Sequence, residues 1–217
     1  MARKKRVWYP GAMFHVMSRG NRQAPIFADE SDYELFLKYM LRVREKHPFK
    51  VHGICLMTNH FHIAMETENV ELSKIMQKIL SLYAEEYNHR HDYTGHLFQG
   101  RYKAQLIEDE RYFLEVSRYI HLNPVKAYMV KEPLAYTYGS YGLFVNKGGS
   151  VTDKGRARNL SRLFSELVVT DRVLGVFGDN AREKYRTFVE SNSSHDEMEA
   201  LIQKDMNENE LWLPEGV

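Results

Sequence analysis

The sequence contains almost no cysteine and no long hydrophobic run. Cys55 is the only cysteine among 217 residues, which excludes an intrachain disulfide and a cysteine-cluster zinc site and fits a reducing, cytoplasmic compartment. No apolar run approaches the roughly 18 residues that span a bilayer. The basic start of the chain is not followed by the apolar core of a secretory signal. We therefore expect no membrane partner.

Acidic residues are absent from the start of the chain and concentrated at its end. Residues 1–28 contain six basic side chains and no acid, whereas residues 190–217 contain eight acids against Lys204, a charge of −7. Because the whole chain carries +1, residues 1–189 carry the difference, +8. A basic body of this kind suits a protein that binds a polyanion, although a solvated basic surface explains the charge equally well.

Hydrophobic periodicity predicts an α+β fold for the first two thirds of the chain. Strands are expected over residues 12–18, 49–57, 60–67 and 102–107. Helices are expected from Asp29 or Ser31 to just before Pro48, over 72–87, and from Asp109 to about Asn123-Pro124. The order strand-helix-strand-strand-helix-strand is that of a ferredoxin-like sandwich, with an extra helix at its end. In that fold two helices cover one sheet face, and we expect the other face to be open.

The character of the chain changes near residue 150. Glycines at 148, 149 and 155 predict a linker, and apolar spacing between 160 and 190 predicts short helices. We divide the chain into a main domain of residues 1–150, a small helical appendage of 151–190 and a mobile acidic tail of 191–217. Residues from 151 onward are expected to tune the activity without taking part in its chemistry.

The first group that could carry chemistry is His60-Phe-His62. Alternate residues of a strand share a face, so both imidazoles would stand on the open face, about 7 Å apart along the strand. Two imidazoles at that spacing can converge on one metal ion. Two surface histidines without a ligand remain the alternative, because an isolated His-x-His pattern is common.

The second group is Tyr119-Ile-His-Leu-Asn123-Pro124. Positions i and i+4 of a helix lie on the same side, so the Tyr119 phenol would lie next to the Asn123 carboxamide. Pro124 disfavours helical geometry at Asn123, which predicts a fraying or kinked helix end there. A core tyrosine and a helix-terminal asparagine are the alternative interpretation.

Taken together, these groups resemble the HUH endonucleases, and more narrowly the single-tyrosine transposases related to the REP-associated tyrosine transposases (the IS200-like transposase domain). The resemblance rests on Met57-Thr-Asn-His-Phe-His62, Leu97-Phe-Gln-Gly-Arg-Tyr-Lys103 and Tyr119-Ile-His-Leu-Asn-Pro-Val-Lys126, and covers about residues 7–145. It makes residues 1–150 the catalytic domain.

The resemblance implies metal-dependent cleavage and strand transfer of hairpin-containing single-stranded DNA without ATP. His60, His62 and Asn123 would hold Mg²⁺ or Mn²⁺, which polarises the scissile phosphate, and Tyr119 would attack phosphorus to form a 5′-phosphotyrosine. Zinc remains an alternative ion, and Asn123 is a weak ligand where related enzymes often have Gln, Glu or His. Relatives occur as homodimers and as monomers.

The residues of suitable type for holding DNA are basic or aromatic. Nine basic side chains could bind phosphate, and Trp8 and Tyr9 could stack on unpaired bases. The nine are Arg3, Lys4, Lys5, Arg6, Arg19, Arg22, Arg101, Lys103 and Lys126.

Two other functions compete with the transposase. A domesticated hairpin-DNA-binding or regulatory protein would keep the fold without transposition activity, although Tyr119 and both histidines are present. A zinc hydrolase built on the histidine pair lacks a third strong ligand at zinc spacing and an evident general base.

Overall fold

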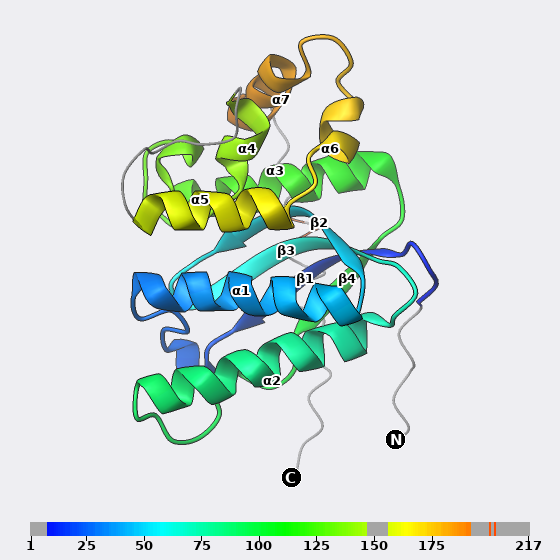
Figure 1. Cartoon of the computed structure of the whole chain (residues 1–217). Coiled ribbons are helices and arrows are strands. Elements are labelled where there is room, and N and C mark those ends of the chain that lie inside the picture. The colour runs from blue at the N-terminus through cyan, green and yellow to red at the C-terminus, as the bar shows by residue number, and fades with distance from the viewer. Residues whose placement is uncertain (1–7, 147–155, 192–199, 201, 203–217) are drawn as a thin grey trace.

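The centre of the structure is a four-stranded antiparallel sheet in the order β2-β3-β1-β4 (Figure 1). The computed structural model describes residues 8–146, 156–191, 200 and 202. The strands are β1 (Met13–Arg19), β2 (Phe49–Leu56), β3 (His60–Thr67) and β4 (Lys103–Ile107). With α1 (Glu30–Lys46) between β1 and β2, and α2 (Leu72–Arg90) between β3 and β4, this is the predicted ferredoxin-like sandwich.

Helices α1 and α2 pack on one face of the sheet because their apolar residues recur at helical spacing. Phe36 of α1 lies against Phe61 of β3 and Tyr83 of α2, with ring centroids 5.0 and 5.1 Å apart. Asp29 is the N-cap of α1, as one of the two predicted alternatives has it, and forms a capping box with Asp32. The helix ends at Lys46, before Pro48.

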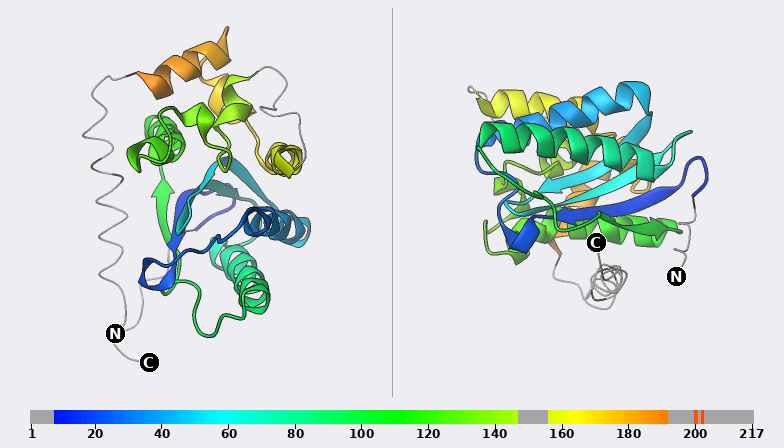
Figure 2. Two further views of the ribbon diagram at one scale, coloured as in Figure 1. Left: turned by 90° about the vertical axis from the view of Figure 1, so that its left-hand side faces the viewer. Right: turned by 90° about the horizontal axis from the view of Figure 1, so that it is seen from below.

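The other sheet face is not open, contrary to the expectation. Helix α3 (Glu110–Lys126) crosses it and contacts β2, β3 and β4, while α1 and α2 stay on the opposite side (Figure 2). Side chains of that face are consequently buried between the sheet and α3. The sequence pattern of α3 predicted a helix but could not show where that helix would dock.

The segments after α3 pack closely on the sandwich. They are a 3-10 turn at Pro133–Ala135, then α4 (Tyr141–Val145), α5 (Arg156–Leu167), α6 (Asp171–Gly175) and α7 (Ala181–Glu190). Val168 forms a parallel bridge to Val51 at the edge of β2, and Arg44 of α1 donates to the Leu167 carbonyl oxygen at 3.1 Å. The α4 and 3-10 segments were not predicted.

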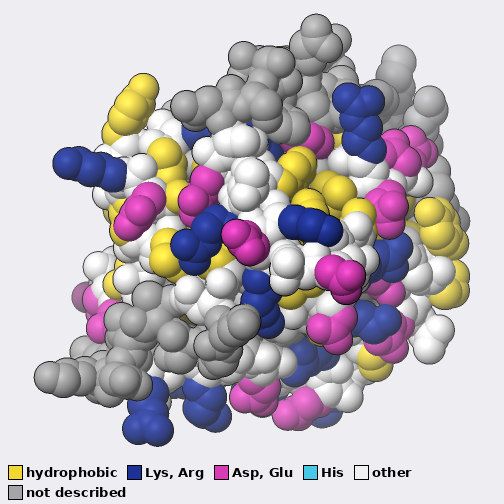
Figure 3. Space-filling model, turned by 90° about the horizontal axis from the view of Figure 1, so that it is seen from above, with side chains coloured by type: hydrophobic (Ala, Val, Ile, Leu, Met, Phe, Trp, Pro, Cys, Tyr) yellow, Lys and Arg dark blue, Asp and Glu magenta, His cyan; other side chains and the backbone are white. Residues whose placement is uncertain are grey.

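The outer face of these C-terminal helices carries charges of both signs. Lys and Arg side chains alternate there with Asp and Glu, and no histidine is visible among the side chains drawn in colour (Figure 3). No described helix is long and apolar enough to cross a membrane. The predicted linker lies outside the described residues, as does most of the acidic tail, although Ile202 is described and buried. The division into three parts stays a prediction.

Candidate active site

Strand β3 places His60 and His62 on the face beneath α3. Phe61 between them points to α1, as strand alternation predicts, and the two imidazole centroids are 5.1 Å apart. His60 is half-buried, but His62 is only 2% exposed. The expectation that both rings are exposed is therefore wrong for His62, because α3 covers this face.

A third histidine, which the sequence analysis missed, joins the pair from β1. The antiparallel register sets Arg19 opposite His60 and Met17 opposite His62, so alternate β1 residues including His15 share their face. His15 is fully buried, and its Nε2 lies 3.1 Å from Nδ1 of His62, a hydrogen-bond distance. Only the register, which no local pattern reveals, brings these two rings together.

The Nδ1 atoms of both β3 histidines are engaged. His60 Nδ1 lies 2.7 Å from Oδ1 of Asn59, whose Nδ2 donates in turn to the Gln23 carbonyl oxygen at 3.1 Å. With His62 Nδ1 bound to His15, Nε2 is the remaining ring nitrogen on each histidine. Asn59 was part of the recognised motif but had been given no role. Two imidazoles held in this way fit a divalent cation.

The three imidazoles are neutral at pH 7. Burial lowers the pKa of His15 to about 3, and burial followed by the positive charge of Arg19 lowers the pKa of His60 to about 4. The pKa of His62 lies well below 6.5, because of burial first and its two histidine neighbours second. Neutral imidazole is the form that binds metal ions.

Tyr119 of α3 lies over the histidines. Its ring centroid is 5.4 Å from that of His62 and 5.7 Å from that of His15, both edge-on. Lys126, two turns further along the same face of α3, has its Nζ 5.4 Å from the Tyr119 ring centroid, a cation–π contact. The Tyr119 side chain is 7% exposed. Tyr119 thus forms one cluster with the two predicted histidine ligands, His62 in direct ring contact and His60 beside it.

Asn123 lies one turn beyond Tyr119, as predicted. Its Nδ2 donates to the Tyr119 carbonyl oxygen at 2.8 Å, which leaves Oδ1 as the atom suited to a cation. The described side chains show no contact between Asn123 and His60 or His62. The predicted fraying at Pro124 is wrong, since α3 continues to Lys126 and the Ala127 amide donates to the Asn123 carbonyl oxygen at 2.9 Å.

Three of the predicted phosphate-binding residues surround this cluster. Arg19 is opposite His60, and Lys103 of β4 pairs with Met17, on the face of His62. Lys126 lies over Tyr119. Arg19 Nε also donates to Oε1 of Gln99 at 2.6 Å, which ties the motif Leu97–Lys103 to the end of β1. Gln99 had no predicted role.

The remaining candidates are more scattered. Arg22 and Arg101 are exposed on the segments that follow β1 and precede β4. Trp8 lies at the far end of β3, where its Nε1 donates to Oγ1 of Thr67 at 2.9 Å. Thr67 is seven residues from His60, about 23 Å along the strand, so Trp8 is not part of the cluster. Arg3, Lys4, Lys5 and Arg6 lie outside the described residues.

His121, between Tyr119 and Asn123, faces away from the cluster into a buried polar network. Its Nδ1 lies 2.7 Å from the Tyr185 hydroxyl of α7, and its Nε2 lies 2.9 Å from Oγ of Ser140. The Tyr185 hydroxyl is also 2.6 Å from Oγ of Ser117, and Gly53 leaves room for this layer against β2. This network attaches α7 to the back of the tyrosine helix.

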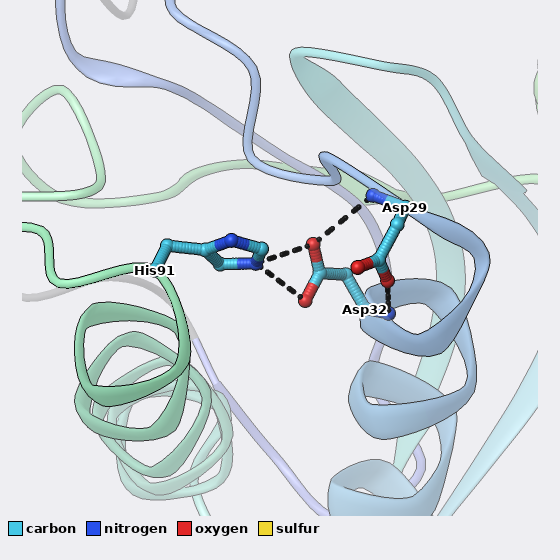
Figure 4. A group of neighbouring side chains, drawn as sticks. All are labelled: Asp29, Asp32 and His91. Atoms are coloured by element: carbon cyan, nitrogen blue, oxygen red, sulfur yellow. Dashed lines mark hydrogen bonds and ion pairs between the residues drawn. The ribbon is translucent and has the colours of Figure 1, made fainter.

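A second group with metal-like spacing, Asp29, Asp32 and His91, lies at the junction of α1 and α2 (Figure 4). Asp32 is fully buried and accepts from the Ala28 amide at 2.8 Å, from His91 Nε2 and from the Arg90 guanidinium. Arg90 also pairs with Asp29. The guanidinium already supplies the positive charge that the two carboxylates need, so this group is a helix cap and not a metal site.

Comparison with known proteins identifies the family. The family model described as "Transposase IS200 like" matches residues 9–123, more than half of the chain, including both β3 histidines and Tyr119. No curated protein matches the chain.

Two solved structures are similar. One is a REP-associated tyrosine transposase bound to a REP hairpin, with 19% identity, a TM-score of 0.57 and coverage of 72% of this chain and 96% of that chain. The other, from Deinococcus radiodurans R1 and assigned as a transposase, has 12% identity, a TM-score of 0.39 and coverage of 55% and 95%. The first supports the fold. On the family model, this chain belongs to the IS200-like transposases.

Proposed function

We propose that the protein cleaves and transfers single-stranded, hairpin-containing DNA through a covalent 5′-phosphotyrosine on Tyr119. The observation that carries the proposal is the contact of the Tyr119 ring with His62, a neutral imidazole whose partner His60 stands beside it. A nucleophile of this type needs a phosphate held next to it and the developing charge neutralised. The family and the hairpin-bound relative favour DNA as the substrate.

His60, His62 and Oδ1 of Asn123 would hold the divalent cation, Mg²⁺ or Mn²⁺. When bound there, the ion supplies Lewis-acid polarisation of a non-bridging phosphate oxygen. The donor set fits, because both imidazoles are neutral and have their Nδ1 atoms occupied. Asn59 and His15 orient the two rings.

The chain's own residues account for the covalent step. The Tyr119 oxygen forms a bond to phosphorus while the bond from phosphorus to the 3′ oxygen breaks. The phenol loses its proton and the departing oxygen gains one, so the products are a 5′-phosphotyrosine and a 3′-hydroxyl. A 3′-hydroxyl of another strand reverses the step, which makes the reaction a transfer. Arg19, Lys103 and Lys126 bind the phosphates on either side.

A second function, DNA binding without cleavage, is favoured by the 7% exposure of the Tyr119 side chain. In that case the protein would act as a hairpin-binding regulator. The two functions differ in one product, the covalent complex between protein and DNA.

The test is to incubate the full chain with a labelled hairpin oligonucleotide in Mn²⁺ or Mg²⁺ and to look for a denaturant-resistant adduct. Tyr119→Phe should abolish the adduct and keep DNA binding, and chelation of the metal should abolish it reversibly. Tyr112→Phe and Tyr93→Phe are controls that should retain it. An adduct that survives in Tyr119→Phe would show the nucleophile to be another residue. If the wild type forms no adduct, the second function, hairpin binding without cleavage, is the one supported.

A further inference from the structure

We infer that His15 is a positioning residue that sets the tautomer and orientation of His62. This inference rests on the proposed function, because it concerns how His62 offers a nitrogen to the cation. Its basis is the 3.1 Å contact between His15 Nε2 and His62 Nδ1, formed between two strands by residues 47 positions apart. Both side chains are buried, at 0% and 2% exposure, so water does not compete for this hydrogen bond.

The neighbouring histidine shows what such a partner does. His60 Nδ1 faces Oδ1 of Asn59, an oxygen that can only accept. His60 must therefore carry its proton on Nδ1 and keep Nε2 as a lone pair. Its ligating tautomer is present before any ion arrives.

The partner of His62 is an imidazole, which can accept or donate. If His62 Nδ1 donates to His15, Nε2 of His62 can bind a cation, and His15 carries its own proton on Nδ1. If His15 Nε2 donates instead, His62 carries its proton on Nε2 and cannot bind. His15 Nδ1 is buried and has no hydrogen-bond partner among the described residues, so either arrangement leaves one polar atom unsatisfied.

The pair therefore has two possible arrangements, and cation binding selects the first. Removing His15 leaves the Nδ1–H of His62 buried without an acceptor and frees the ring to rotate. Changes to partners of metal-binding histidines typically lower metal affinity by about 10–100-fold. His15→Phe should lower the affinity by that amount in the full chain, and His15→Gln, which restores an acceptor, should recover part of it.

The test is titration of the metal-free protein with Mn²⁺ by calorimetry, without DNA. His52→Phe is the matched control, because His52 is a buried histidine of the same sheet face bound to Glu66 at 2.9 Å, away from the cluster. It should keep the wild-type affinity. Long-range ¹H–¹⁵N spectra with Mg²⁺ should show His62 protonated on Nδ1.

The outcomes separate this inference from the proposed function. Unchanged Mn²⁺ affinity in a folded His15→Phe variant, or a proton on Nε2 of His62 in the loaded protein, overturns the role of His15 alone. If the His60→Ala variant binds Mn²⁺ as tightly as the wild type, the proposed metal site is wrong, and the role of His15 is wrong with it.

A second observation carries an independent inference: we propose that Tyr128 is a stacking site for an unpaired nucleobase. Tyr128 lies two residues beyond the end of α3 and is 96% exposed; among the described residues the next most exposed large apolar side chain is Tyr9, at 49%. Its backbone has φ = 56°, the left-handed region that a bulky residue rarely adopts and that glycine commonly fills after a helix. The Tyr128 ring is therefore not part of the packed core, and backbone strain of this kind is often found at functional sites.

The location of Tyr128 suits an unpaired base a few nucleotides away from the cleaved phosphate. Its amide donates to the Val125 carbonyl oxygen at 2.9 Å, which anchors it beside Lys126, the residue over the Tyr119 ring. Nine residues separate it from Tyr119, roughly 13 Å along a helix, or about four stacked nucleotides. An aromatic ring at that distance, with a lysine between, matches the alternation of base stacking and phosphate contact in single-strand sites.

Two substitutions test the stacking site with a labelled single-stranded oligonucleotide of mixed sequence. Tyr128→Ala should weaken binding about 10-fold and leave duplex binding unchanged, because paired bases cannot stack on the ring. Tyr93→Ala, an exposed tyrosine elsewhere, is the matched control. Tyr128→Gly should lower affinity equally while the melting temperature stays level or rises, since glycine relieves the strain.

A loss of melting temperature in Tyr128→Gly, or unchanged single-strand affinity in either variant, would overturn the stacking site. A wild type that does not bind single strands at all would overturn the proposed function together with it.

Discussion

The described residues include four buried histidines on the α3 side of the sheet, and three of them, His15, His62 and His121, differ in the partners of their ring nitrogens. His15 and His62 face each other, whereas His121 contacts only neutral groups: the Tyr185 hydroxyl, the Ser140 hydroxyl and the ring of Tyr141, 5.4 Å away between centroids. Because no acid pairs with it in these contacts, burial lowers the pKa of His121 to about 3. The contribution of His121 to the free energy of unfolding should therefore decrease as the pH is lowered.

The unfolded chain binds a proton at His121 near pH 6.5 and the folded chain only near pH 3. Stability from this residue is complete above pH 6.5 and is lost as the pH falls between the two values. His121→Gln should reduce the pH slope of the unfolding free energy in that window by about 1.4 kcal/mol per pH unit. The measurement is urea unfolding at several pH values. Tyr185→Phe should keep the slope, and an unchanged slope in His121→Gln would contradict the pKa assignment.

At the scale of elements, α7 is bound to α3 by side-chain hydrogen bonds. Arg118 of α3 donates to the carbonyl oxygens of Phe188 and Ser191, at 3.1 and 3.0 Å, and the Tyr185 hydroxyl makes the second link. The Tyr185 oxygen lies between Oγ of Ser117 and Nδ1 of His121, at 2.6 and 2.7 Å, and all three side chains are buried. Tyr185→Phe should destabilise the protein by about 1–3 kcal/mol, because two buried polar atoms lose a partner while the ring packing is kept. Urea unfolding at pH 7 measures this. A loss below about 0.5 kcal/mol would mean that the network does not hold α7.

The C-terminal helices also bear on where the catalytic unit ends. Residues 151–217 include Val168, which pairs with the edge of β2, and Tyr185, which closes the network behind α3. A chain ending at residue 150 would expose both sites and should lose cooperative thermal unfolding, whereas a chain ending at residue 202 should keep it. All proposed chemical residues precede residue 127, so a 1–150 fragment that unfolded cooperatively and formed the adduct would show that these helices are dispensable.

At the scale of the whole molecule, basic charge is unevenly distributed. Arg19, Lys103 and Lys126 surround the Tyr119 cluster, while the face of the C-terminal helices mixes both signs (Figure 3). DNA binding should depend on salt through the counterions that these contacts release. The first residues of the chain add four more basic side chains.

Replacing Arg3, Lys4, Lys5 and Arg6 by glutamine should flatten the plot of log affinity against log salt by about 0.7 per lost contact on single strands. Fluorescence anisotropy over a salt series measures the slope. Replacing Arg162 and Lys184 by glutamine is the matched control, because these lie on the C-terminal helices. Equal slopes in the wild type and the first variant would mean that the start of the chain does not contact DNA.

Much of the fold is determined by the sequence alone, because its signals are local. Apolar spacing set both core helices, Asp29 and Asp109 capped helices as predicted, and strand alternation put His60 and His62 on one face. The spacing of Tyr119 and Asn123 on one helix is likewise local, although the Asn123 amide donates to the main-chain carbonyl of Tyr119, whereas the prediction placed it beside the phenol. Periods of 2 and 3.6 residues carry this information without reference to distant parts of the chain.

Only the tertiary structure determines the contacts that depend on strand register and on where each helix docks. The pairing of β1 with β3 brings His15 next to His62. The docking of α3 buries His62, which strand alternation alone would leave exposed. The same non-local packing put Trp8 at the far end of β3 and His121 against Tyr185. Partners 47 or 64 residues apart meet only because burial of both sheet faces selects one register and one helix position, and no window of sequence contains both.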